Sequence, residues 1–118
     1  MRVVVVSPFP AERSALEGLL RDEGYEVRAV ASRVEAVTLA ATDHPDVIIA
    51  EVQVPGLDGV ALVRQLSHLA SPPSTILVCP RSDRILEQLG VVCLIKPIDL
   101  GLLYRHLARL APRESHVA

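Results

Sequence analysis

Short hydrophobic runs alternate with amphipathic stretches five times along the chain. Val3 to Val6 is an unbroken β-branched run, and further apolar runs occupy 47–50, 75–79 and 91–95. The runs at 3–6 and 47–50 are typical of strands buried on both faces of a parallel sheet, and 75–79 and 91–95 are predicted as two further strands. The stretch "YEVRAVA" at 25–31 instead alternates apolar and polar residues, which predicts a half-exposed strand at the edge of the sheet.

The segments between these runs carry apolar residues at helical spacing. Helices are predicted over 11–23, after the capping box "SRVE" at 32–35, after Asp58, over 82–89 and after Asp99. Four of the five are expected to bury a defined set of apolar residues, namely Leu16, Leu19 and Leu20; Val34, Val37 and Ala41; Leu62, Val63, Leu66 and Leu69; and Leu103, Leu107 and Leu110.

Regular alternation of strands and helices predicts an α/β fold with a parallel sheet covered on both faces. We expect a flavodoxin-like three-layer (βα)5 sandwich with strand order 2-1-3-4-5, since the exposed strand suits an edge and the strands at 3–6 and 47–50 suit the centre. The predicted domain covers 1–111, and residues 112–118 form a polar tail.

Sheets of this kind place their ligands beyond the carboxyl ends of the strands. The residues expected there are Ser7, Pro8, Glu51, Cys79 and Lys96. Glu51 is unusual because it ends an otherwise apolar run, "VIIA", in a carboxylate. These residues are therefore the candidate site.

Composition excludes several classes of function. Aromatic residues make up 3% of the 118 residues and the net charge is −2, so neither stacking platforms nor a basic surface supports direct nucleic-acid binding. No signal peptide and no apolar run near ~18 residues is evident, so we expect a soluble cytoplasmic protein without a membrane contact. Cys79 and Cys93 lie in apolar runs, which favours packing over disulfide or metal chemistry.

Four segments resemble the CheY-like receiver domain of bacterial two-component response regulators. They are the first strand and helix, the stretch "PDVIIAEVQVPGLDGVALVRQL", the run "STILVCPRSD" and the ending "CLIKPID". The resemblance covers residues 2–111 and includes Lys96, which in that family pairs with a phosphoryl group. It implies a cis peptide bond between Lys96 and Pro97.

Five signature positions depart from the family pattern. Ser7 and Pro8 stand where the family has two acids that hold Mg²⁺, and Glu51 stands where an Asp accepts the phosphoryl group from a histidine kinase. Cys79 replaces a Thr or Ser that contacts the phosphoryl group, and Cys93 replaces the aromatic residue that switches inward.

The departures suggest a degenerate pseudo-receiver that is not an enzyme. Without paired acids we expect no tight Mg²⁺ site, no phosphorylation, no cofactor and no catalytic residue. Glu51 is expected to contact Lys96, either as a partial mimic of a phosphorylated aspartate or as a relic. Function would then depend on contacts with a regulator, kinase or output domain, or with a second copy. The alternative is a regulatory module that binds an anionic metabolite in the same crevice.

Overall fold

The computed structural model describes residues 1–52, 59–82 and 84–110, with the side chain of Ile85 excepted. Asp58 and the tail at 112–118, on which two of the predictions fall, lie outside these ranges. The strands are β1 (Arg2–Val6), β2 (Glu26–Val30), β3 (Val47–Glu51), β4 (Ser74–Cys79) and β5 (Val92–Ile95). The helices are α1 (Pro10–Asp22), α2 (Arg33–Asp43), α3 (Gly59–Ser67), α4 (Arg84–Gln88) and α5 (Leu100–Leu110).

The sheet has the predicted topology. Its strands pair in parallel in the order β2-β1-β3-β4-β5. The alternating strand lies at one edge, and the two apolar strands β1 and β3 lie inside, because only an inner strand has both faces covered. Every residue of β3 is buried, including Glu51 at its carboxyl end.

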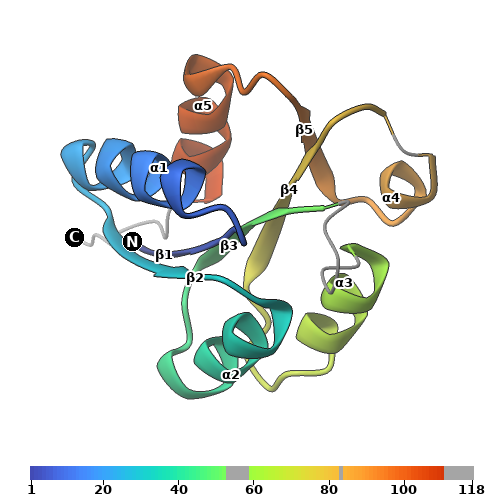
Figure 1. Ribbon diagram of the computed structural model, residues 1–118. Helices are drawn as coiled ribbons and strands as arrows, with labels where there is room; N and C mark the ends of the chain where they lie inside the picture. The colour runs from blue at the N-terminus through green and yellow to red at the C-terminus, as the bar shows by residue number, and fades with distance from the viewer. Residues whose placement is uncertain (53–58, 83, 111–118) are drawn as a thin grey trace, which may run out of the picture.

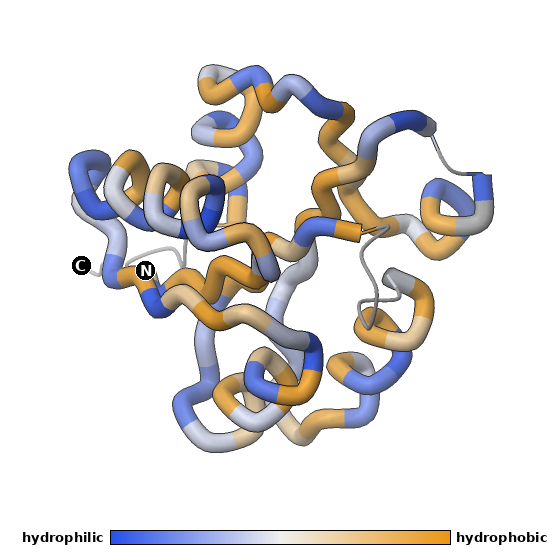
Figure 2. The backbone as a smooth tube through the Cα atoms, in the orientation of Figure 1, coloured by the Kyte–Doolittle hydropathy of each residue, from blue (hydrophilic) through white to orange (hydrophobic). Residues whose placement is uncertain are grey.

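Two hydrophobic cores flank the sheet and give the three-layer sandwich that the sequence predicts. Alternate residues of each strand point to opposite faces, so Val4 and Ile48 enter one core while Val5 and Ile49 enter the other. Figure 1 shows α1 and α5 over one face and α2, α3 and α4 over the other. Figure 2 shows hydrophobic and hydrophilic residues mixed along each helix, as expected for helices with one buried face.

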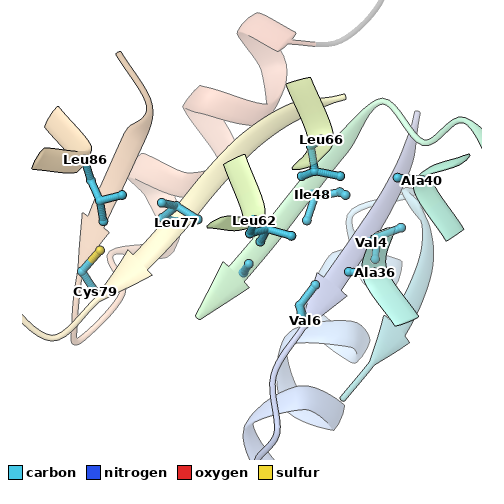
Figure 3. Close-up of a cluster of buried hydrophobic side chains, with 11 residues drawn as sticks. Val4, Val6, Ala36, Ala40, Ile48, Leu62, Leu66, Leu77, Cys79 and Leu86 are labelled. Carbon is cyan, nitrogen blue, oxygen red and sulfur yellow. The ribbon is translucent and has the colours of Figure 1, made fainter. Parts of the chain in front are cut away.

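The residues of α2 that face the sheet differ in part from those that the sequence predicts. Ala36 and Ala40 of α2 are buried against Val4 and Val6, as Figure 3 shows. Val34, which was expected on the inner face, is 71% exposed, and Ala41 is exposed too. Val37, the third residue expected there, is partly buried against the same core. The small alanines let the helix approach the sheet closely, so they form the centre of its buried face.

Helix ends form largely as the sequence predicts. The hydroxyl of Ser32 accepts a hydrogen bond from the backbone N–H of Glu35 at 3.2 Å. The Glu35 carboxylate accepts from Ala31 at 3.4 Å, one residue earlier than a regular capping box. Asp99 caps α5 by accepting from the backbone N–H of Leu102 at 3.1 Å.

Candidate functional site

The site begins with a carboxylate at the end of the central strand. Glu51 is only 7% exposed, although glutamate is seldom buried unless it is paired. It lies beside Val78 in the sheet, and the chain continues through Val52, whose N–H donates to the Val78 carbonyl at 3.0 Å. The strand therefore fixes the backbone of Glu51 and directs its side chain toward the α1 side of the sheet.

Lys96 provides the partner for this carboxylate. It directly follows β5, and its backbone N–H donates to the Cys79 carbonyl at 2.9 Å. Its Nζ lies 3.2 Å from Oε2 of Glu51, so the contact expected from the sequence is confirmed. The peptide bond between Lys96 and Pro97 is cis, which is also as expected.

The site contains a second carboxylate that the sequence analysis missed. Oε2 of Glu12 lies 3.3 Å from Nζ of Lys96, so the same ammonium contacts two carboxylates. Glu12 stands in the first turn of α1, where the positive end of the helix favours an acid. A signal was present in the sequence: Glu12 precedes Leu16 by four residues and so shares its helix face.

The pKa values of the two carboxyl groups shift in opposite directions. Burial raises the pKa of Glu51, and a hydrogen bond that its protonated form makes to Glu12 raises it further. The same hydrogen bond lowers the pKa of Glu12, and Lys96 lowers it as well. Partial burial favours the neutral amine of Lys96, but its bonds to Glu51 and Glu12 outweigh this and raise its pKa. As the pH falls, Glu51 therefore takes up a proton before Glu12 does.

Ser7 is part of the local structure at the start of α1. Its hydroxyl is buried and accepts a hydrogen bond from the backbone N–H of Phe9 at 3.2 Å. Its carbonyl accepts from the guanidinium of Arg13 at 2.8 Å. Pro8 follows Ser7 in the chain, is half-buried, and has no oxygen in its side chain. These two residues therefore shape the turn into α1.

The two cysteines lie on the other side of the sheet. Cys79 is buried in the core beneath α2, α3 and α4, where Figure 3 shows it near Leu86. Cys93 is half-buried and packs against the same core. Both side chains therefore sit away from the pair formed by Glu51 and Lys96, and the structure places them as packing residues.

The described ranges contain neither a cluster of metal-binding side chains nor a membrane-spanning helix. Within 1–52, 59–82 and 84–110, three or more His, Cys, Asp or Glu side chains do not gather at any point in a way that could hold a metal ion. Of the helices that lie in those ranges, none has the length and apolar character needed to cross a membrane.

Comparisons with known proteins agree with the fold. A family model described as "Response regulator receiver domain" matches residues 3–108. The chain is 34% identical over 119 residues to the response regulator PleD of Caulobacter vibrioides, covering 92% of this chain and 26% of PleD. It therefore spans about a quarter of that relative.

Solved structures resemble the chain along most of its length. A CheY-like receiver domain from Methylobacillus flagellatus matches with a TM-score of 0.84 and 22% identity, covering 94% of this chain and 98% of that one. The chemotaxis response regulator CheY4 of Vibrio cholerae matches with a TM-score of 0.81 and 25% identity, covering 93% and 98%. Both share the flavodoxin-like parallel sheet of order 2-1-3-4-5.

Proposed function

The chain belongs to the response regulator receiver domain family of two-component signalling, and on that premise we propose that it works without being phosphorylated. The observation that carries this proposal is the position of Lys96. Its ammonium contacts both Glu51 and Glu12, at 3.2 and 3.3 Å. The group that would receive a phosphoryl oxygen is thus already paired with the protein's own carboxylates.

The donor groups do not fit Mg²⁺. This ion prefers an octahedron of oxygen ligands and is commonly held by carboxylates. The hydroxyl of Ser7 already accepts the N–H of Phe9, and Pro8 offers no side-chain oxygen. The carboxylates of Glu51 and Glu12 both accept from the Lys96 ammonium, at 3.2 and 3.3 Å, so they leave too few free oxygens for the octahedron that Mg²⁺ prefers. We therefore assign no phosphoryl transfer, no resident metal and no catalytic reaction to this site.

The side chain at position 51 also has the wrong reach for an acceptor. Glutamate is one methylene longer than aspartate, and a misplacement near 1 Å costs on the order of 100-fold in rate. The added length lets its carboxylate meet Lys96 directly. Glu51 carries about one charge where a phosphoryl group carries up to two, so it acts as a partial and permanent substitute for the phosphorylated state.

In this proposal the domain acts through its surface. A receiver held in one state by its sequence has no input at position 51, so its output is recognition by another regulator, kinase or output domain, or by a second copy. Cys93 supports the absence of switching. Its side chain is small, has no ring that could swing between two positions, and packs half-buried against the core. An anionic ligand, the alternative, is disfavoured because Lys96 is already engaged by two carboxylates.

The test is the intact mass of the protein after incubation with acetyl phosphate and Mg²⁺. We expect no phosphoryl adduct. The matched comparison is the triple variant Ser7→Asp, Pro8→Asp, Glu51→Asp, which restores the acids that the family carries at these positions. An adduct on the parent chain, mapped by peptide analysis to Glu51 and lost in Glu51→Gln, would contradict the proposal.

A further inference from the structure

A groove opens beside Glu51 on the side of the sheet covered by α1 and α5. Its volume is about 560 Å³, which lies within the range of roughly 300–1,000 Å³ typical of small-molecule sites. The walls are apolar: α1 supplies Ala15, Leu16 and Leu19, and the segment after β5 supplies Ile98 and Leu100. Leu19, which was expected to be buried, is instead 39% exposed, so part of this wall faces water.

One part of the groove's lining is charged, and the charges do not balance. Glu12, Glu51 and Lys96 line it together, so two carboxylates face one ammonium. Glu51 is more than nine-tenths buried, and its desolvated carboxylate shares Lys96 with Glu12. An anion beside these groups would be repelled by two carboxylates and attracted by one ammonium, whereas a cation would compensate the excess negative charge.

We propose that this groove binds a small amphipathic organic cation, an ammonium or guanidinium group carried on an apolar body. The cationic group lies between the carboxylates of Glu12 and Glu51, beside Lys96, and donates hydrogen bonds to them. The apolar body lies along the leucine-lined wall and shields Leu19 from water. A bare metal ion fits less well, since the apolar walls supply no further oxygen ligands.

The proposal rests on the proposed function in one respect, that Glu51 and Lys96 stay paired and do not serve phosphoryl transfer. The two are tested by separate readouts, since phosphorylation is measured by mass and ligand binding by resonance shifts. A protein that binds the cation and is also phosphorylated would refute the proposed function alone.

The probe is n-octylammonium, titrated into the ¹⁵N-labelled protein below its micelle concentration, with octanoate and methylammonium as companions. We expect octylammonium to shift amide resonances in α1 and in residues 96–100. Methylammonium, which lacks the apolar body, should bind at least about tenfold more weakly, and octanoate should leave these resonances unchanged.

Two variants distinguish the contribution of the charged groups of the groove from that of its apolar wall. Glu12→Gln removes the excess charge and keeps the pair between Glu51 and Lys96, so affinity for octylammonium should fall about tenfold, the order for one lost charge-assisted hydrogen bond. Leu19→Ser should weaken octylammonium and leave methylammonium unaffected. The matched control is Glu26→Gln, an exposed acid on β2 outside the groove, which should bind octylammonium like the parent.

Three results would overturn the proposal. They are octanoate binding as tightly as octylammonium, Glu12→Gln retaining the parent's affinity, and a flat titration in which octylammonium shifts no resonance of the groove.

Discussion

Nζ of Lys96 lies 3.2 Å from Oε2 of Glu51, and this contact joins the central strand β3 to the segment that follows β5. Glu12 adds a second contact to the same ammonium at 3.3 Å and so ties α1 to the other two elements. Three elements far apart in the sequence therefore meet at one lysine.

Removal of the lysine side chain should destabilise the fold. Lys96→Ala leaves Glu51 buried without its cation, and a buried charge deprived of its partner is costly. Because the side chain of Lys96 is 35% exposed, solvent screens part of the loss, and we expect about 1–3 kcal/mol in the free energy of unfolding. Urea denaturation of Lys96→Ala, Glu51→Gln and the double variant measures the coupling. Additive effects of the two single changes would show that the contact has no energetic role.

Stability should depend on pH through Glu51. Its pKa is raised above the ordinary value of 4.5 on folding, so its contribution is complete below pH 4.5 and disappears as pH rises through the folded pKa. Glu51→Gln lacks this titration, so its stability relative to the parent should increase between pH 4.5 and neutral pH. Denaturation curves at both pH values provide the measurement, and a constant difference between the two proteins would contradict the assignment.

Glu12 should change the pH dependence of stability in the opposite direction to Glu51. Its pKa is lowered, so its contribution is present above the unfolded value of 4.5 and is lost as pH falls through the folded pKa. Glu12→Gln should therefore match the parent most closely in strongly acidic solution and become less stable relative to it as pH rises to 4.5. Acid titrations monitored by circular dichroism test this, with the exposed acid Glu26→Gln as the control. A Glu12→Gln profile like that of the control would contradict it.

The corrected face of α2 makes a sharp mutational prediction. Ala40 is 1% exposed against the sheet, so Ala40→Leu should overpack the core and cost about 1–3 kcal/mol. Val34 is 71% exposed, so Val34→Ser should change the stability by less than about 0.5 kcal/mol. Thermal or urea unfolding distinguishes them, and the reverse ranking would restore the face expected from the sequence.

The sequence predicts the fold well because its signals are local and redundant. β-branched runs such as Val3 to Val6 specify buried strands, and the alternation at 25–31 specifies the edge. The inner face of α2 was predicted correctly at Val37 but wrongly at Val34 and Ala41. Hydrophobic spacing favours large residues, while close helix–sheet packing selects the alanines at 36 and 40.

The site was only partly predictable. Glu51 ends one strand and Lys96 follows another, and the carboxyl ends of these strands meet at one edge of the sheet, so their contact could be expected from topology. Glu12 lies in a polar helical segment, and its role depends on how α1 is rotated over the sheet, which Leu16 and Leu20 determine by packing. The excess negative charge around Lys96 could therefore be recognised only from the position of α1 in the structure.

The most direct test of the central claim is a crystal structure of the protein soaked with Mg²⁺ and beryllofluoride, a phosphoryl mimic. We predict that Lys96 remains within hydrogen-bond distance of Glu51 and Glu12 and that neither the metal nor the fluoride complex is bound beside them. Well-ordered Mg²⁺ and beryllofluoride against Glu51, with Lys96 turned to the fluorides, would contradict the account.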